Sequence, residues 1–291
     1  MADVPLSIDH QDFETLAPIA GSILKAGGGW PRFSVEAPAL LRRAIDEVID
    51  APRTNRFTIR EIEKTEKTYL GTKVEILIRN YLKLPRGSIL DLSIDGIEVD
   101  IKNTMSSNWT IPREAIGHTC LIIRENEVKS ICDVGLIVAR AEYLNAGQNR
   151  DQKRTFRSAA ISENTWWLLK HCPYPRNFFE TMPKKDRERI MRAGAARQRL
   201  AELFDVVQEV PISGQIVEAI SQQADYMKRL RRNGGARDIL APKGIAVLWG
   251  QADASLIAQL GLPITNKDEF ISFRAKTEEQ LHILRTKGHI D

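Results

Sequence analysis

Two acidic residues and a lysine lie on neighbouring segments of this sequence, where a turn would bring them together. Asp91 lies in SILDLSI, and Asp100 and Lys102 lie in IEVDIKN, on the two sides of an Asp-Gly dipeptide at 95–96. Asp-Gly suits a two-residue type I′ turn, because both central positions of that turn need a positive φ. The pattern predicts a β-hairpin that sets Asp91 opposite Asp100.

Opposed carboxylates repel each other unless a cation lies between them. In a non-hydrogen-bonded antiparallel pair the Cβ atoms are roughly 4.5 to 5.5 Å apart. A divalent cation between Asp91 and Asp100 would turn the repulsion into a binding site, and Lys102 on the same strand face would point toward it. The alternative is a solvated outer face of an amphipathic hairpin, although threonines or opposite charges suit such a face better.

The two strands of the hairpin alternate between apolar and polar residues. Because successive strand side chains point to opposite faces, the apolar set is predicted to face the core. Its members are Leu90, Leu92, Ile94, Ile97, Val99 and Ile101. The other face carries Ser93 and Glu98 together with Asp91, Asp100 and Lys102.

A helical pattern from residue 59 to residue 82 precedes the hairpin. Its predicted buried stripe follows helical spacing and consists of Leu70, Val74, Leu77, Ile78 and Tyr81. Glu75 lies about 100° around the helix from Val74, at the edge of this stripe. A glutamate there reaches the border of the core, where it either pairs with a nearby Lys or Arg or belongs to a site.

Asp91, followed on the next strand by Asp100-Ile101-Lys102, resembles the PD-(D/E)XK nuclease signature. The wider set is more specific, because Glu75 stands sixteen residues before Asp91 and Asp100 follows nine residues after it. This spacing resembles the NaeI family of type II (type IIE) restriction endonucleases, and the resemblance covers most of the chain. It implies an α/β fold, with a mixed-sheet restriction-endonuclease-like nuclease domain followed by a mainly helical, winged-helix-like DNA-binding domain.

The resemblance also implies the chemistry, which is Mg²⁺-dependent hydrolysis of phosphodiester bonds in double-stranded DNA. Asp91, Asp100 and the backbone carbonyl of Ile101 would hold the metal ion, and Glu75 would hold a second metal ion or a metal-bound water. Lys102 would orient the attacking water, lower its pKa or stabilise charge in the transition state, and these three roles remain open. The family reads a GC-rich palindrome.

The composition is that of an ordinary water-soluble protein with room for two cores. The chain has 291 residues, of which 43% are hydrophobic and 27% charged. No apolar run approaches the ~20 residues of a membrane span, and the acidic N-terminus does not read as a secretory signal, so we expect a cytoplasmic protein, bacterial as the resemblance implies. Three cysteines without CxxC spacing indicate neither a disulfide framework nor a zinc site.

Net charge is only +4, but basic residues concentrate between residues 150 and 243. This distribution favours a polyanionic partner. No Walker loop, no GxGxxG after a strand and no HExxH occurs in the sequence, which removes the motifs for nucleotide-driven and zinc-protease chemistry.

The nuclease domain is predicted to span residues 1–150. Apolar runs at 119–123 and 131–139 predict further strands buried on both faces, and 141–145 leaves the sheet. The polar segment after Lys102 reads as a loop beside the active face, where loops commonly hold substrate. The DNA-contact candidates in this loop are Asn103, Asn108, Trp109 and Arg113.

A linker is predicted at 151–175, beginning in the polar stretch 147–154, and the DNA-binding domain at 176–291. One long helix is expected at 183–207, and two short helices at 213–221 and 224–233 have the form of a helix-turn-helix, with a wing strand at 243–249. The second short helix would be the recognition helix, with Lys228, Arg229, Arg231 and Arg232 facing DNA. Thr277 and Gln280 form a predicted capping box for a closing helix at 278–286.

Cleavage of both strands of a palindrome implies a C2 homodimer with one centre per strand. The resemblance further implies activation by a second DNA site bound in the C-terminal domain, and a cognate DNA methyltransferase that protects self-DNA. Two alternatives remain, a winged-helix DNA-binding regulator without nuclease activity and a DNA repair nuclease of the same superfamily. The complete set of Glu75, Asp91, Asp100 and Lys102 argues against the regulator, which has no need of all four.

Overall fold

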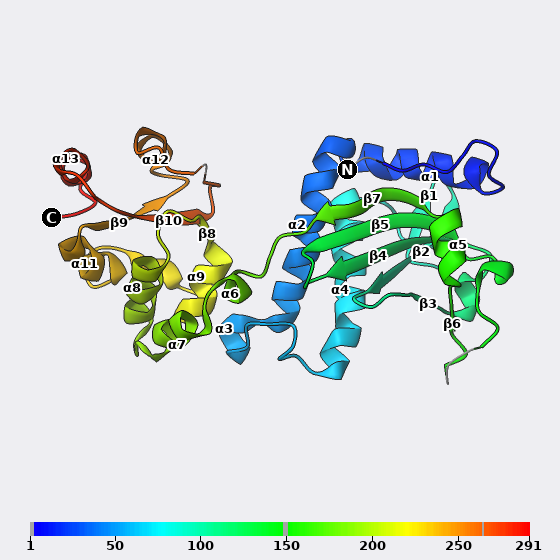
Figure 1. Ribbon diagram of the computed structural model, residues 1–291, viewed down its shortest axis with the longest axis horizontal. Coiled ribbons are helices and arrows are strands. Elements are labelled where there is room, and N and C mark those ends of the chain that lie inside the picture. The colour runs from blue at the N-terminus through cyan, green and yellow to red at the C-terminus, as the bar shows by residue number, and fades with distance from the viewer. Residues whose placement is uncertain (1–2, 148–150, 264) are drawn as a thin grey trace. The chain divides into compact units, whose positions relative to one another are not determined.

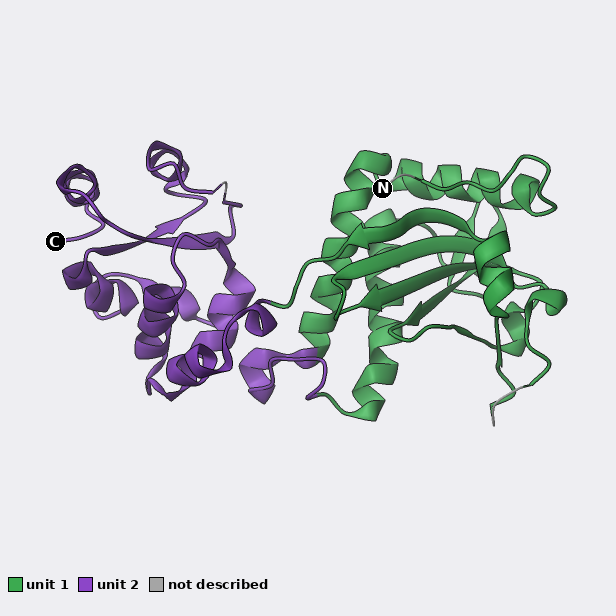
Figure 2. Ribbon diagram, viewed as in Figure 1, with its two compact units in different colours: residues 1–48, 62–177 green, residues 49–61, 178–291 purple. Residues whose placement is uncertain are grey.

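Residues 3–147, 151–263 and 265–291 are described by the computed structural model. The chain divides into two compact units, one formed by residues 1–48 and 62–177 and the other by residues 49–61 and 178–291 (Figure 2). The chain therefore passes between the units at three places. The short segment 49–61, expected within the nuclease domain, belongs to the second unit.

The helices of the first unit are α1 (Phe13–Ala26), α2 (Trp30–Ile49), which ends at the unit boundary, α4 (Lys64–Leu82) and α5 (Ser158–Asn164), with 3₁₀ turns η1 (Arg113–Ala115) and η2 (Ala141–Tyr143). Helix α4 begins five residues later than predicted, because Glu63 and Glu66 form a reciprocal capping box at its first turn. The predicted buried stripe of α4 is confirmed except that Leu82 is buried in place of the partly exposed Tyr81.

A five-stranded sheet forms the centre of the first unit, in the order β1-β2-β4-β5-β7 (Figure 1). Its strands are β1 (Leu92–Ile94), β2 (Ile97–Thr104), β4 (Thr119–Asn126), β5 (Ile131–Val138) and β7 (Trp166–Pro173), and a separate two-stranded ribbon pairs β3 (Thr110–Ile111) with β6 (Arg154–Thr155). Strands β2 and β4 are parallel and the other neighbours are antiparallel, so the predicted mixed sheet is confirmed. Helix α4 packs against β2, and α1 packs against β5 and β7.

The segment 151–175, predicted as a linker, instead completes the first unit. It supplies β6, α5 and β7, and β7 is a full edge strand of the sheet. The WWLL sequence at 166–169 is buried there, as an apolar run in a strand covered on both faces should be. The predicted start of the linker includes residues 148–150, which lie outside the described residues.

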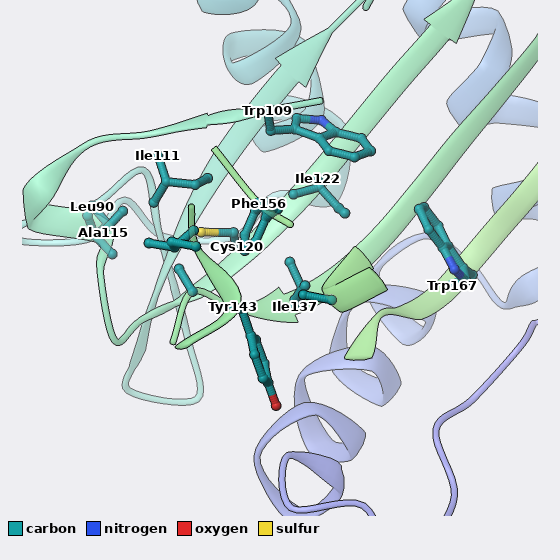
Figure 3. Close-up of a cluster of buried hydrophobic side chains, with 13 residues drawn as sticks. Leu90, Trp109, Ile111, Ala115, Cys120, Ile122, Ile137, Tyr143, Phe156 and Trp167 are labelled. Carbon is teal, nitrogen blue, oxygen red and sulfur yellow. The ribbon is translucent and has the colours of Figure 1, made fainter. Parts of the chain in front are cut away.

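Both faces of the central strands are covered, as predicted. The register of β2 on β4 sets Asp100 beside Cys120 and Lys102 beside Ile122. That face is covered by a hydrophobic cluster that includes Trp109, Phe156 and Ile137 (Figure 3). The acidic face of the hairpin therefore borders a packed core instead of an open solvated surface.

The second unit contains many short helices and a three-stranded antiparallel sheet. The helices are α3 (Ala51–Thr54), α6 (Phe178–Thr181), α7 (Lys184–Arg192), α8 (Ala196–Val206), α9 (Gly214–Ser221), α10 (Tyr226–Leu230), α11 (Ala236–Leu240), α12 (Ala254–Gln259) and α13 (Glu278–Thr286), with the 3₁₀ turn η3 (Ala241–Lys243). The sheet has the order β8 (Ile212–Ser213), β10 (Glu269–Arg274), β9 (Ile245–Trp249). Its core joins β9 and β10 to α12 and α13 through side chains such as Leu248, Ile271 and Leu284.

Two helix predictions in the second unit were wrong in length. The helix expected at 183–207 is broken into α7 and α8, because Gly194 adopts a φ of 85° that a continuing helix does not allow. The second helix of the predicted helix-turn-helix ends at Leu230, so that Arg231 and Arg232 follow the helix instead of lying on it.

Side-chain caps define the starts of two helices in this unit. Ser213 caps α9, with its Oγ accepting a hydrogen bond from the amide of Ile216 at 3.4 Å. A strand, β9, lies where the wing strand was expected, and α13 begins with the predicted Thr277 and Gln280 capping box. All three cysteines are buried and free. Among the described residues, no helix has the length and apolar character needed to cross a membrane.

Candidate active site

The hairpin turns where the sequence predicted. Asp95 and Gly96 have φ values of 52° and 82°, and the pairing sets Leu92 opposite Val99 and Ile94 opposite Ile97. Positive φ at both central positions is the requirement of the type I′ turn. The Asp-Gly dipeptide therefore fixes the register of β2, and with it the positions of Asp100 and Lys102.

Asp91 lies outside the regular ladder, in contrast to its predicted pairing with Asp100. Strand β1 begins only at Leu92, and one carboxylate oxygen of Asp91, Oδ2, accepts a hydrogen bond from the amide of Ile101 at 2.7 Å. The predicted alternation of faces therefore does not extend before Leu92. Leu90, expected on the face opposite Asp100, packs in the cluster with Cys120, on the same side of the sheet as Asp100. Ile97, expected in the core, is 36% exposed beside the turn.

Asp100 is the most deeply buried of the four residues implied by the resemblance. It is 4% exposed, and its Oδ1 accepts a hydrogen bond from the Lys102 ammonium at 2.7 Å. Its other oxygen, Oδ2, is buried without a hydrogen-bond partner among the described residues. Burial raises the pKa of Asp100 to about 6, although the charge and hydrogen bond of Lys102 act in the opposite direction and nearby Asp91 adds to the rise.

Lys102 points back along its own strand. Besides its contact with Asp100, its Nζ lies 3.3 Å from the backbone carbonyl oxygen of Ile101. The ammonium group therefore contacts two of the oxygen atoms that the resemblance assigns to the metal ion.

Glu75 reaches the same group of acids from α4. Its carboxylate pairs with Arg79 at 3.1 Å, one helical turn later. Burial raises the pKa of Glu75, the negative charge of Asp91 raises it further, and Arg79 partly offsets both effects. Glu75, Asp91 and Asp100 thus form one electrostatic group, although they come from three separate segments.

The donor set fits a hard divalent cation. Carboxylate and carbonyl oxygens are the ligands that Mg²⁺ prefers, and the unpartnered Oδ2 of Asp100 leaves one such oxygen available in a buried position. Within the described part of the chain, no cluster of three or more His, Cys, Asp or Glu side chains is arranged to hold a metal ion. The fit therefore rests on Asp91, Asp100 and the carbonyl of Ile101.

The loop after Lys102 does not present the expected set of DNA contacts. Trp109 is only 1% exposed, and its Nε1 donates to the carbonyl of Ile123 at 2.8 Å, so the prediction that it contacts DNA was wrong. Asn108 bonds inward, with its Nδ2 donating to the carbonyl of Phe156 at 2.6 Å. Trp109 begins a segment that pairs as β3 with β6 and covers the sheet, a role that polarity alone does not reveal. Arg113 remains exposed.

Asn103 is directed toward a buried acid. Its Nδ2 donates to Oε1 of Glu125 at 2.6 Å, and the other oxygen of Glu125 is buried without a partner among the described residues. Burial raises the pKa of Glu125 from 4.5 to about 8, with the hydrogen bond from Asn103 only partly offsetting it. The side-chain amide of Asn103 is therefore hydrogen-bonded inside the fold.

We expect Glu125→Gln to change how stability depends on pH. Because the folded-state pKa of Glu125 is raised, its protonated form stabilises the fold fully below about pH 4.5, and this contribution is lost as pH rises toward about 8. The free energy of unfolding of the wild type should fall relative to that of the variant across this window, by at most about 1.4 kcal/mol per pH unit. Denaturant titrations from pH 5 to pH 8.5 measure this, and parallel profiles would contradict the assignment.

The four basic residues predicted to face DNA lie on and after α10. Lys228 pairs with Asp225 at 2.6 Å, and the Nε of Arg229 donates to Gln223 at 2.5 Å. Arg232 is 3.4 Å from the C-terminal Asp291, and Arg231 is exposed without an ion pair among the described residues. Arg231 is thus the cation of this group that is freest to meet a phosphate.

Sequence reasoning missed two residues next to these acids. The sequence does contain a signal for Arg79, because its i, i+4 spacing from Glu75 is common for an ion pair on a helix. Glu98 was placed only on the polar face of the hairpin, yet its carboxylate accepts four hydrogen bonds from the segment 88–90, which lower its pKa to about 2. No sequence pattern signals that contact, because it depends on how the chain enters β1.

Comparison with known proteins agrees with this geometry. The family model described as restriction endonuclease NaeI matches residues 31–283, which include all of α4, the hairpin and most of the second unit. The type II restriction enzyme NaeI of Lentzea aerocolonigenes is 33% identical over 243 residues, which cover 81% of this chain and 76% of that enzyme. Both matches extend over both units, and this chain belongs to the NaeI restriction endonuclease family.

Proposed function

We propose that this protein is a Mg²⁺-dependent endonuclease that cuts double-stranded DNA at a specific sequence. Membership of a restriction endonuclease family supports cleavage of DNA. The observation that carries the metal-dependent mechanism is the convergence of Asp91, Asp100 and Lys102 around the middle of β2, with a buried carboxylate oxygen of Asp100 left without a hydrogen-bond partner among the described residues. A buried carboxylate oxygen without a hydrogen-bond partner is costly unless it serves a ligand.

In this proposal each residue has a defined task. Asp91, Asp100 and the Ile101 carbonyl would hold Mg²⁺, and Glu75 would hold a second metal ion or a water molecule of the first. The cation would supply positive charge that polarises the scissile phosphate and offsets the charge of the transition state. Lys102 holds its ammonium proton donors beside Asp100, where they orient the attacking water or stabilise developing negative charge. The hydrophobic cluster beside Asp100 excludes water from one side of the site.

The second unit is proposed to bind DNA as a winged-helix-like module. Helix α9 and the shortened α10 form the helix pair, and β9 with β10 forms the antiparallel strands that follow it. Lys228, Arg229, Arg231 and Arg232 are the proposed phosphate contacts on and after α10. Asn103 and Arg113 remain proposed contacts of the first unit, and of the two Arg113 is the exposed one.

Substituting Arg231 and Arg232 together with alanine should weaken DNA binding and reduce its salt dependence. Loss of two phosphate contacts lowers the slope of log affinity against log salt concentration by about 1.8, because each contact releases a condensed counterion. Fluorescence anisotropy with a labelled duplex at several salt concentrations, in EDTA, measures this slope.

The matched control for that variant removes Lys267 and Lys287, two exposed lysines of the same unit outside the helix pair. Both double variants lose two positive charges. Equal losses of DNA affinity and of salt dependence in the two double variants would show that only the overall charge matters. Arg231 and Arg232 would then no longer count as DNA contacts.

Assembly and partners follow from cutting both strands. A C2 homodimer provides one catalytic centre for each strand of a palindromic site. A cognate DNA methyltransferase is the expected functional partner, because a site-specific nuclease needs protected self-DNA. A second DNA copy bound by the second unit is proposed to activate cleavage, and adding a short duplex that carries the site should then accelerate cutting of a plasmid with a single site.

Mapping the ends of the cleavage products tests site specificity. We expect purified protein and Mg²⁺ to convert GC-rich plasmid DNA into discrete fragments whose ends all fall in one sequence. Scattered ends, or cleavage confined to mismatched or branched DNA, would instead indicate a repair nuclease. Retarded but intact DNA would indicate a binding protein that regulates without cutting.

A further inference from the structure

The carboxylate of Glu98 organises the segment that leads into Asp91. Its Oε1 accepts hydrogen bonds from the amide and hydroxyl of Ser88 at 2.7 and 2.8 Å. Its Oε2 accepts from the amides of Ile89 and Leu90 at 3.2 and 2.8 Å. Three consecutive backbone amides thus converge on one side chain of the neighbouring strand, and the residue after them is Asp91.

The position of Asp91 depends on this segment because the paired residues of β1 and β2 do not include Asp91. Strand β1 pairs with β2 only from Leu92 onward, so Asp91 precedes the first ladder pair. Behind it the chain folds back, with the amide of Ser93 donating to the carbonyl of Pro85 at 2.9 Å. The position of the Asp91 carboxylate is therefore set by the bond to the Ile101 amide on one side and by the Glu98 contacts on the other.

Gly87 gives independent evidence that the segment closes tightly around the Glu98 carboxylate. A Cβ atom at residue 87 would lie 2.3 Å from Oε2 of Glu98 and 2.5 Å from the carbonyl oxygen of Leu90. Neither approach is possible for real atoms, so any side chain at residue 87 would displace the carboxylate, the backbone or both. Glycine at this position is a packing requirement of the Glu98 contacts.

We propose that Glu98 is a positioning residue for the metal site, which fixes the backbone of residues 88–90 and so sets the Asp91 carboxylate beside Asp100 and Ile101. The consequence for catalysis rests on the proposed function, because it takes Asp91 as a metal ligand. Among the described residues, the hydrogen bonds of the Glu98 carboxylate all come from residues 88–90, and Glu98 is not assigned to the metal ion. Outer partners that hold a ligand in place commonly change metal affinity about 10- to 100-fold when they are replaced.

The test compares Glu98→Gln with the wild type in two measurements. Glutamine has the same shape, but its NH₂ group cannot accept hydrogen bonds, so it satisfies only part of the four donors. Hydrogen exchange of the Ile89 and Leu90 amides should become faster in the variant. Isothermal titration of the DNA-free protein with Mn²⁺ should show affinity reduced about tenfold, and cleavage should recover at high Mg²⁺ concentration because only ligand placement has changed.

Two further variants separate positioning from general stability. Gly87→Ala should weaken Mn²⁺ binding in the same direction, because it displaces the same carboxylate. Ser93→Ala changes the direct cross-strand neighbour of Glu98 and should leave Mn²⁺ affinity unchanged. Glu98→Asp keeps the negative charge and all acceptor oxygens. Even if replacing Glu98 lowers the melting temperature, this variant should retain more Mn²⁺ affinity than Glu98→Gln.

The possible results distinguish the two proposals. Wild-type protein that binds no Mn²⁺ and cuts no DNA would overturn the proposed function, whereas faster exchange at residues 89 and 90 in Glu98→Gln would still show that Glu98 orders the segment. Wild-type protein that binds Mn²⁺ as expected, with a Glu98→Gln variant of equal affinity, would overturn the positioning role while leaving the nuclease assignment intact.

Discussion

Asp100→Asn is expected to abolish DNA cleavage while leaving metal-free DNA binding largely intact. The amide cannot supply the negative charge that would hold Mg²⁺ in the proposed site, and losing several kcal/mol of transition-state stabilisation would slow cleavage by about 10³-fold or more. Folding should not suffer, because burial already disfavours the ionised form of Asp100 and raises its pKa to about 6. Single-turnover cleavage, DNA binding in EDTA and thermal melting together measure these three effects.

Asp133→Asn is the matched control for this variant. Asp133 is a buried acid of the same sheet, bound to Arg124 and to the amide of His171, and it lies on β5, which β4 separates from the strand of Asp100. Its replacement should lower stability and leave the cleavage rate of the folded protein unchanged. The account would be contradicted if Asp100→Asn cut DNA at a normal rate, or if its only defect were a failure to fold.

Lys102→Met is expected to abolish cleavage and, in the same protein, to strengthen binding of a divalent cation. The Lys102 ammonium contacts Asp100 at 2.7 Å and the Ile101 carbonyl at 3.3 Å, so it would compete with the proposed cation for these oxygens. Removing a partly buried ion pair worth about 1 kcal/mol should tighten Mn²⁺ binding about fivefold. Calorimetry without DNA measures the affinity, and a plasmid assay measures the cleavage rate.

Lys129→Met, in the exposed turn between β4 and β5, controls for the loss of one positive charge. This variant should change neither the Mn²⁺ affinity nor the cleavage rate. An unchanged Mn²⁺ affinity in Lys102→Met would mean that the ammonium and the metal ion do not share ligand atoms. Normal cleavage by that variant would remove Lys102 from the catalytic group.

Features encoded by a few adjacent residues were predictable from the sequence. Asp95-Gly96 fixes the hairpin register because only certain residues adopt positive φ at both positions of the turn. The Thr277 and Gln280 capping box likewise marks the start of α13, because the two side chains satisfy backbone amides within a single turn. Strand β2 was also predictable from the sequence, since its alternation of polar and apolar residues reflects burial on a sheet.

Features that depend on distant packing were not predictable from a single sequence. Trp109 lies in a polar segment, and only the core formed by β4, β5 and residue Phe156 explains its burial. Asp91 leaves the strand ladder because residues 88–90 bond to Glu98, a contact without a sequence signature. The strand β7 was taken for part of a linker, because an edge strand far along the chain is identified by its partner, β5.

The measurement that tests the central claim most directly is cleavage of GC-rich plasmid DNA by the wild-type protein in two buffers, one with Mg²⁺ and one with EDTA. We expect discrete fragments with Mg²⁺ and intact plasmid with EDTA, because the proposed mechanism requires a cation at Asp91, Asp100 and the Ile101 carbonyl. Equal fragmentation in both buffers would contradict a metal-dependent centre at these residues, and intact DNA in both would contradict the nuclease assignment itself.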